Sequence, residues 1–466
     1  MTDIVLDYTN VMATAVGPEN GLAEEQLTSL KRRAAEIHNE LSKKRNSGAL
    51  PFYDLPYQKE SAQAIITAAK KIKRDFSNMV VLGIGGSALG TTALFSALRH
   101  SMHNSLPYKK RGGTRLYILD NIDPDWFEEM IGGLKLKETV FNVISKSGAT
   151  AETMAQFMII LDTLKKKLGK KEWRKHLIIT TDKKSGSLRP IAEEHKLKSF
   201  EVPDGVGGRF TALTPVSLLP AACAGVDIEA LLEGAARMDE RLKNGDIMGN
   251  PAYLFASIHY LLDTVKAKKM AVMMPYSNKL YYMADWFRQL WAESLGKKKD
   301  IDGAPVHTGQ TPIKALGATD QHSQVQLYVE GPFDKVVTFL EVGKFENVAP
   351  IPDEFPGVED VSYLSGHSLN ELIGVEKQGT EYALTKNNRP NLTIRMPQVD
   401  AHSVGQLIYM LEVATAFAGG LYRINAFDQP GVEFGKNYAY AKFGKKGYED
   451  LAREIAETHG QEKRTV

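Results

Sequence analysis

The sequence predicts an α/β protein with two tandem, mainly parallel sheets flanked by helices, and with helical arms at both ends. Its 466 residues suffice for two or three folded units at about 100 to 200 residues each. Short apolar runs alternate with helical patterns, as expected of strands connected by crossover helices. This alternation occurs twice, before and after a glycine-rich segment at residues 205–215. We therefore expect two α/β units in tandem.

The composition excludes several classes of protein. The chain is 43% hydrophobic and 24% charged, which rules out disorder. Lys plus Arg number 58 and Asp plus Glu 56, so the net charge of +2 does not indicate a nucleic-acid partner. Cys223 alone cannot form an internal disulfide, and one cysteine favours a reducing compartment. With no secretory signal in the acidic N-terminal stretch and no membrane span, we expect a cytoplasmic protein.

The first half begins with an amphipathic helix in residues 21–45, where leucines and isoleucine recur three or four residues apart. A second helix is expected at about 60–75. Four apolar runs that are too short for buried helices then predict strands, in NMVVLGIGG, RLYILDN, FNVISKSGAT and HLIITTD. A helix follows the first of these runs and another follows the third, so the crossovers favour a parallel sheet.

The second half repeats this order. Helices are predicted in IEALLEGAARMDERL, YLFASIHYLLDTVKAK and YYMADWFRQLWAESLG, and strands in KKMAVMMPYSN, QVQLYVEG, VVTFLEV and RPNLTIRMP. QLIYMLEVATAFAGGLY indicates a mostly buried helix and YEDLAREIAETHG a surface one. The expected organisation is an arm, a first unit, a connecting segment, a second unit and a C-terminal segment, at residues 1–45, 46–204, 205–250, 251–420 and 421–466.

Two loops that leave predicted strands carry anion-binding chemistry. In GIGGSALG, glycines let backbone amides and the Ser87 hydroxyl approach an anion at a helix N-terminus, although a dinucleotide turn or a plain tight turn also fits. In SKSGAT, three hydroxyls and a lysine within six residues suit one phosphate, although a helix N-cap also fits. The residues of this second loop are Ser145, Lys146, Ser147 and Thr150.

The helix in WFRQLWAESLGK predicts a buried stripe formed by Phe287, Leu290, Trp291 and Ser294 or Leu295. Gln289 and Glu293 then share a different face, which could line a cleft. An ordinary solvent-exposed ion pair of Glu293 with Lys297 is the alternative.

Three further segments offer candidate residues. Arg209 follows two glycines that let its guanidinium approach an oxyanion. His322 lies in a polar loop before a predicted strand, and Lys436, with Gln429 seven residues before it, enters a helix after a Pro-Gly turn. Each could equally be a solvated surface residue.

Together these segments resemble the phosphoglucose isomerase family in its compact bacterial form. GIGGSALG, SKSGATAET, GVGGRF, the Gln289–Lys297 helix, GATDQHSQ and DQPGVEFGK occur in the family's order. The resemblance implies two sugar isomerase (SIS) domains. It implies that Glu293 is the isomerase base, that His322 and Lys436 assist ring opening, and that Arg209 stands beside the enediolate. It assigns substrate binding to Gly86, Ser87, Ser145, Lys146, Ser147, Thr150, Gln289 and Gln429.

The implied reaction is the reversible interconversion of glucose 6-phosphate and fructose 6-phosphate through a cis-enediol. It moves one proton between C2 and C1 and needs neither a cofactor nor a metal. The resemblance further implies a homodimer in which the histidine reaches the neighbouring subunit's site, with no nucleic-acid or membrane partner.

Three alternatives remain open at this point. An NAD-dependent dehydrogenase would use GIGGSALG and Asp120, but Asp120 lies 32 residues after Ala88, beyond the usual spacing of roughly 20. A non-catalytic sugar-phosphate-binding protein would need only the two loops. An isomerase that also accepts mannose 6-phosphate is the third, which Gln289 disfavours by resemblance.

Overall fold

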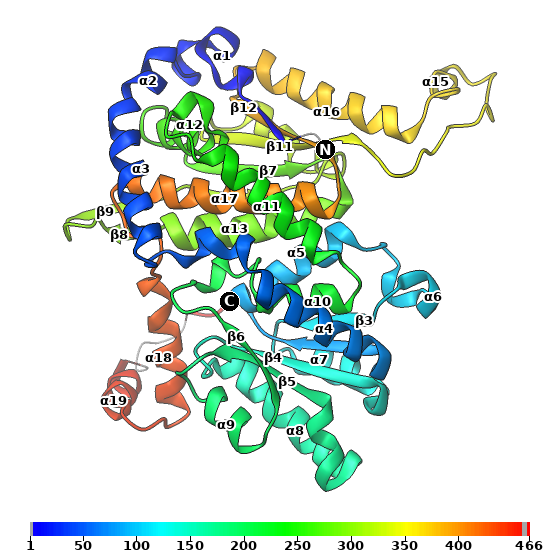
Figure 1. Cartoon of the computed structure of the whole chain (residues 1–466). Coiled ribbons are helices and arrows are strands. Elements are labelled where there is room, and N and C mark those ends of the chain that lie inside the picture. The colour runs from blue at the N-terminus through cyan, green and yellow to red at the C-terminus, as the bar shows by residue number, and fades with distance from the viewer. Residues whose placement is uncertain (1–2, 459–463) are drawn as a thin grey trace.

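The computed structural model describes residues 3–458 and 464–466 and contains two five-stranded sheets (Figure 1). The first sheet is parallel throughout, in the order β3-β2-β4-β5-β6. Val80 of β2 lies opposite Tyr117 of β3 and Phe141 of β4. The strands are β2 (Asn78–Leu82), β3 (Arg115–Leu119), β4 (Thr139–Ile144), β5 (Leu177–Asp182) and β6 (Lys198–Val202).

The second sheet has the order β1-β12-β11-β7-β10, and only its edge strand β1 runs antiparallel to its neighbour. Its strands are β1 (Val5–Asp7), β7 (Met270–Pro275), β10 (Thr311–Lys314), β11 (Lys335–Lys344) and β12 (Asn391–Gln398). A small antiparallel pair, β8 (Lys297–Lys299) and β9 (Pro305–Thr308), lies apart from both sheets. The predicted class, α/β with mainly parallel sheets, is confirmed.

Helices fill the space between the two sheets and cover their outer faces (Figure 1). Those of the first half are α1 (Ala13–Asn20), α2 (Glu24–Ser29), α3 (Lys31–Asn46), α4 (Lys59–Asp75), α5 (Leu89–Leu98), α6 (Tyr108–Arg111), α7 (Pro124–Gly132), α8 (Ala151–Glu172), α9 (Leu188–Glu194) and α10 (Pro215–Cys223). Those of the second half are α11 (Ile228–Leu242), α12 (Pro251–Thr264), α13 (Tyr281–Leu295), α14 (Val325–Glu330), α15 (Glu359–Ser362), α16 (Leu369–Lys386), α17 (Ala401–Tyr422), α18 (Glu433–Lys442) and α19 (Glu449–Thr458).

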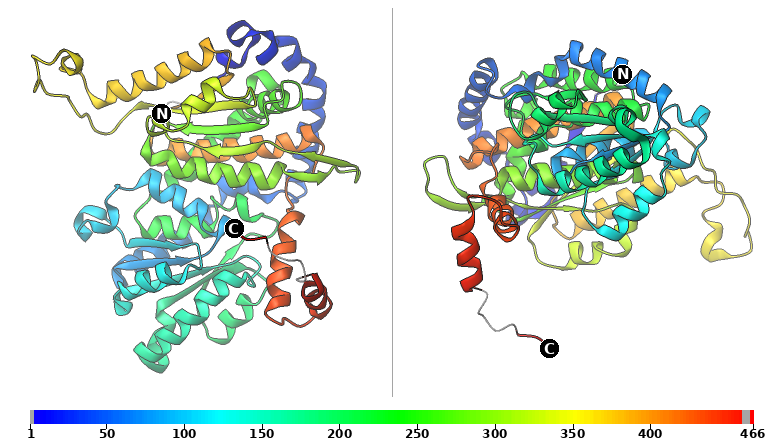
Figure 2. Two further views of the ribbon diagram at one scale, coloured as in Figure 1. Left: turned by 180° about the vertical axis from the view of Figure 1, so that it is seen from behind. Right: turned by 90° about the horizontal axis from the view of Figure 1, so that it is seen from below.

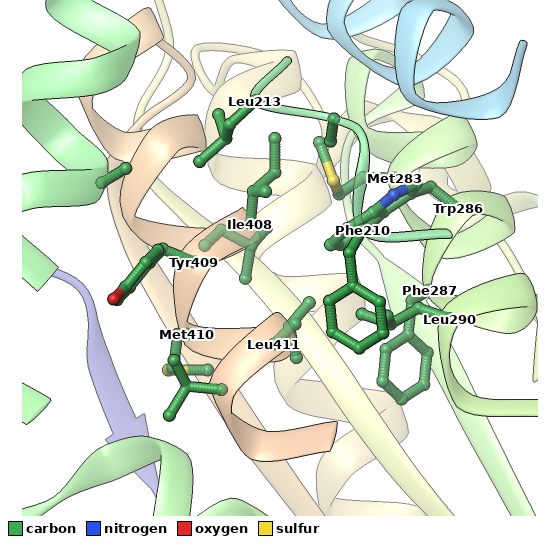
Figure 3. Packing of buried hydrophobic residues seen from close by; sticks show 14 of the residues in the cluster. Phe210, Leu213, Met283, Trp286, Phe287, Leu290, Ile408, Tyr409, Met410 and Leu411 are labelled. Atoms are coloured by element: carbon green, nitrogen blue, oxygen red, sulfur yellow. The ribbon is translucent and has the colours of Figure 1, made fainter. Parts of the chain in front are cut away.

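The core runs continuously from one sheet to the other, because α4, α5 and α10 pack beneath the central helices α11, α13 and α17. Figure 3 shows Phe210 and Leu213 among side chains of α13 and α17. Within the described residues, α17 alone is long and apolar enough to cross a membrane, and 94% of its most apolar window is buried inside the protein. The predicted buried helix is thus confirmed.

One predicted strand is wrong. QVQLYVEG forms α14, although its valines and leucine alternate with polar residues as in a strand. Tyr328 is buried whereas Leu327 is 55% exposed, so the inward face follows helical spacing. The Tyr328 hydroxyl donates to Gln324 Oε1 at 2.7 Å, one helical turn away. His322 therefore precedes a short helix and not a strand.

The arms differ in detail from the expectation. The helix at 21–45 is two helices, α2 and α3, that meet at Leu30, and the arm adds β1 to the second sheet by pairing with β12. α18 and α19 lie beside the first half, and the segment around α15 projects from the second (Figure 2). The exact domain boundaries stay a prediction.

Candidate active site

The glycine turn after β2 lies against the segment that carries Arg209. A Cβ on Gly86 would stand 2.1 Å from the carbonyl oxygen of Gly208, so only glycine allows this backbone contact. Thr211 Oγ1 donates to the Gly86 carbonyl at 2.8 Å and fixes the two segments together. Ser87 follows in the same turn, half-buried at the start of α5. The turn and the Arg209 segment are thus positioned as one unit.

The second loop, residues 145–150, joins β4 to α8 and gathers its hydroxyls around Thr150. Thr150 Oγ1 lies 2.9 Å from Ser145 Oγ and 3.5 Å from Ser147 Oγ. Gly148 adopts φ +63°, a left-handed conformation that glycine tolerates, and so lets the loop turn back on itself. The three hydroxyls face one another at the N-terminus of a 22-residue helix, which suits a phosphate group. The N-cap alternative is not supported, since the Thr150 side chain makes no capping hydrogen bond.

Lys146 connects this loop to the Arg209 segment, because its Nζ donates to the carbonyl of Val206 at 2.7 Å. Val206 is only three residues before Arg209. Both loops of the first sheet therefore contact the same short glycine-rich segment.

Arg209 is buried and organises the centre of the site. Its side chain is 1% exposed. The guanidinium donates to Ser294 Oγ at 2.7 Å, to Gln429 Oε1 at 2.9 Å, and to the carbonyls of Ala426 and Asp428 at 2.5 and 3.0 Å. Burial lowers its pKa, and the nearby carboxylates of Glu293 and Asp428 oppose that shift. This arginine joins α13 to the segment that precedes α18.

Glu293 lies between Arg209 and Gln289. Its Oε1 accepts from Gln289 Nε2 at 3.1 Å, and its Oε2 stands 3.5 Å from Arg209 Nη1. The carboxylate is one-third exposed, so it remains open on one side. Gln289 also approaches the glycine turn, since a Cβ on Gly85 would lie 3.2 Å from its Nε2. Among the described residues, the buried Gln289 Oε1 has no hydrogen-bond partner. The predicted face of α13 thus meets the edge of the first sheet, and the predicted stripe is buried.

Lys297, which the sequence indicates only as the possible partner of Glu293 in an exposed ion pair, is buried beside the site. Its side chain is 5% exposed, and Nζ donates to the carbonyls of Glu293 and Ser294 at 2.6 and 3.0 Å. Burial and the Arg209 charge lower its pKa to about 8, against the attraction of Asp428 and Glu293. A lysine directly after a helix end is the signal that could have identified it, because a cation satisfies the last helical carbonyls.

The other two predicted residues lie elsewhere in this chain. His322 is exposed in a single turn before α14. Lys436 is on α18, where the predicted helix is confirmed, and its half-exposed side chain pairs with Glu433 at 2.9 Å. In the part of the chain that the structure describes, no hydrogen bond or ion pair joins either residue to Glu293 or Arg209. The single chain therefore assembles the phosphate loops, the carboxylate and the arginine, but not the histidine or this lysine.

Comparisons with known proteins identify relatives over nearly the whole chain. The profile of a family described as phosphoglucose isomerase matches residues 59–353 and 365–450. A glucose-6-phosphate isomerase of Carboxydothermus hydrogenoformans is 48% identical over 451 residues, which cover 97% of each chain.

Two solved structures share the fold. One is a hypothetical protein of Thermus thermophilus, with a TM-score of 0.83 and 36% identity over 94% of this chain and 99% of that one. The other is a glucose-6-phosphate isomerase of Chlamydia trachomatis, with a TM-score of 0.73 and 25% identity over 86% of this chain and 77% of that one.

Proposed function

The chain belongs to the phosphoglucose isomerase family, and from this premise we propose that it interconverts glucose 6-phosphate and fructose 6-phosphate. The observation that carries the proposal is the partly open Glu293 carboxylate, held by Gln289 and Arg209 beside two hydroxyl-bearing loops. This arrangement offers a base that can remove a proton from carbon, together with an anion site whose loop contacts the same glycine-rich segment as the base does through Arg209.

The reaction follows from these groups. The loop residues Ser145, Ser147 and Thr150 hold the phosphate together with Gly86, Ser87 and Lys146, so that binding energy from the non-reacting end positions C1 and C2. Glu293 takes the C2 proton and returns it to C1 through a cis-enediol, while the proton of the O2 hydroxyl passes to O1. Arg209 stabilises the developing oxyanion. Gln289 and Gln429 hold the sugar hydroxyls. Substrate and product are isomers, so the step consumes no oxidant or reductant, and Glu293 and Arg209 supply the base and the cation that it requires.

We infer that His322 and Lys436 assist opening of the sugar ring. Because His322 is exposed and makes no contact with Glu293 among the described residues, we infer that it serves the site of a second copy. The working unit is then a cytoplasmic homodimer. Lys436 reaches its substrate by breaking its ion pair with Glu433, which is weak because both side chains are about half exposed.

The alternatives are less well supported. A dehydrogenase is not favoured, because the family and the named relatives are isomerases. A non-catalytic binding protein would not require the carboxylate and guanidinium pair. Activity on mannose 6-phosphate is an addition to the proposed reaction, and substrate competition decides it.

The decisive experiment is turnover of fructose 6-phosphate, followed through a coupled glucose-6-phosphate dehydrogenase, in wild type and Glu293→Gln. We expect kcat to fall at least about 10³-fold, since an amide cannot accept the proton. Glu233→Gln, an exposed glutamate on α11, is the matched control and should behave as wild type. Turnover that survives in Glu293→Gln excludes this residue as the base, and no turnover in wild type excludes the proposed reaction.

Mixing two inactive variants tests the shared site. Glu293→Gln and His322→Asn homodimers are each expected to be inactive. If His322 crosses to the partner, subunit exchange creates one intact site in each hybrid and restores part of the activity. Absence of recovery, once exchange is demonstrated by mass spectrometry, would show that each chain uses its own histidine.

A further inference from the structure

A cavity of about 820 Å³ opens at the carboxyl edge of the second sheet, and none of the site residues named above lines it. Its walls come from the ends of β7, β11 and β12, from the start of α16, and from the C-terminal end of α5 with the loop between α10 and α11. Its size lies within the range of small-molecule sites, roughly 300–1,000 Å³.

The position of this cavity follows from the strand order. In the first sheet, β2 connects to β3 on one side while β4 connects to β5 on the other, so the chain changes direction between β2 and β4. The two hydroxyl-bearing loops lie at that point. In the second sheet, β7 connects to β10 on one side and β11 to β12 on the other, so the same change falls between β7 and β11. Parallel sheets place ligands in the crevice at such a point, and the cavity lies there.

The charges on its walls favour an anion. Arg99, Lys279 and Lys344 line it, and within the described residues none of the three forms an ion pair with a carboxylate, although the Arg99 guanidinium donates to the carbonyls of Gly225 and Arg111. Among the residues from 3 to 458, Lys279 Nζ donates only to the Arg99 carbonyl at 3.0 Å, and burial lowers the pKa of this lysine.

Two of the three carboxylates that line the cavity accept hydrogen bonds from backbone amides. Asp227 caps α11 by accepting from the amides of Glu229 and Ala230, and Asp400 caps α17 by accepting from that of Ser403. Glu346, exposed at the rim, is the remaining carboxylate, and its charge raises the pKa of Lys279. The lining thus holds three cations and three carboxylates, but two of the carboxylates are bound by the amides at helix N-termini, so within the described part of the chain Lys279 and Lys344 keep no carboxylate partner of their own.

The remaining lining defines the kind of molecule that fits. Ser277, a buried residue that follows β7, places a hydroxyl-bearing side chain in the wall. Leu98, Val226 and Ile373 supply apolar wall. We propose that this cavity is a second ligand site, which takes a small organic phosphate by its anionic group at Arg99, Lys279 and Lys344 and covers its body with the apolar wall.

The test counts inorganic phosphate bound per chain by equilibrium dialysis, with the probe at the same concentration for all variants. We expect two sites in wild type. Ser147→Glu, which places a negative charge in the first loop, should retain only the cavity site. Lys344→Glu should retain only the loop site, with at least tenfold weaker binding in the cavity, while its turnover of fructose 6-phosphate stays at the wild-type value.

Lys344 is exposed and makes no ion pair within the described residues, so its replacement should not disturb folding. Lys137→Glu makes the same charge change on an exposed lysine far from the cavity and should bind as wild type. Crystals soaked in tungstate, an anomalous-scattering analogue of phosphate, should show a peak beside Lys279.

Two results overturn the proposal. The first is wild-type stoichiometry in Lys344→Glu. The second is that wild type binds one phosphate per chain and Ser147→Glu binds none, while a neighbouring chain fills the cavity in the crystal. A single site in wild type that Lys344→Glu weakens and Ser147→Glu leaves intact counts against the proposed phosphate loop and not against this cavity.

Discussion

Replacing Arg209 by lysine keeps the positive charge and removes the planar donor set. The guanidinium donates to Ser294, Gln429 and two backbone carbonyls, all at or below 3.0 Å. A lysine ammonium is one nitrogen at the end of a shorter side chain, so it can retain at most two of these four partners. Each lost hydrogen bond to a charged group is worth about 1.5–3 kcal/mol, which predicts a loss of about 3–6 kcal/mol for Arg209→Lys.

This loss should divide between stability and catalysis. Part of it loosens the segment that carries Gln429 and lowers the midpoint of urea unfolding. Removal of a donor aimed at the oxyanion should also lower kcat by about 10²–10³-fold. Both quantities can be measured on the same preparation, by tryptophan fluorescence in urea and by the coupled assay.

The control is Arg237→Lys. Arg237 also makes a two-pronged contact, with Asp3 at 2.9 and 2.7 Å, but its side chain is 54% exposed. Exposed pairs contribute about 0.2–1 kcal/mol, so this variant should unfold and turn over nearly as wild type does. If Arg209→Lys behaves like its control, the guanidinium does not organise the site.

Three further predictions concern single residues. Ser145→Ala should raise KM for fructose 6-phosphate about tenfold with kcat nearly unchanged, because one phosphate contact is worth about 1.4 kcal/mol; an equal fall in kcat would place Ser145 at the reacting carbons. Gly86→Ala should yield inactive or unfolded protein, because its Cβ would stand 2.1 Å from the Gly208 carbonyl, and circular dichroism distinguishes the two outcomes; a fully active variant would refute the close contact. The pKa of Lys297 is about 8 in the folded protein and 10.5 ordinarily, so between these values the unfolded state binds more protons than the folded state. The free energy of unfolding of wild type should therefore rise, relative to that of Lys297→Met, by about 1 kcal/mol from about pH 7 to about pH 9. If the difference in unfolding free energy between the two proteins stays constant over this range, the pKa of Lys297 is not shifted.

The sequence predicts elements well where one periodicity dominates. In α13, Phe287, Leu290 and Trp291 recur at helical spacing, and all three are buried as expected. In α14 two periodicities compete, because alternating valines and leucine favour a strand while burial of Tyr328 requires a helix. Tertiary packing decides such a short segment, and local pattern does not contain that information. β1, β6 and β10 escaped prediction because most of their residues are partly or fully exposed, so none of them forms a continuous apolar run like that of β2.

The residues of the site also divide into those whose contacts local sequence predicts and those whose contacts depend on the tertiary fold. The hydroxyl cluster of the 145–150 loop follows from local sequence, since its members are neighbours in the chain. The contacts of Arg209 do not, because Ser294 and Gln429 lie 85 and 220 residues away. Burial of Lys297 was missed for a related reason: i, i+4 spacing indicates an exposed ion pair unless the helix is known to end between the two residues, as it does at Leu295.

The placement of the site on two sheets couples its chemistry to the packing between them. The proposed phosphate loops belong to the first sheet, whereas Glu293 is on a helix that follows β7 of the second. Arg209 joins them, and its neighbour Phe210 is packed among the side chains of α13 and α17 (Figure 3). A cavity made in this cluster would shift the carboxylate relative to the phosphate loops, and displacements of about 1 Å can lower a rate by about 10²-fold. Substitutions of Phe210 should therefore reduce kcat more than their effect on stability alone explains, although Phe210 touches no reacting atom.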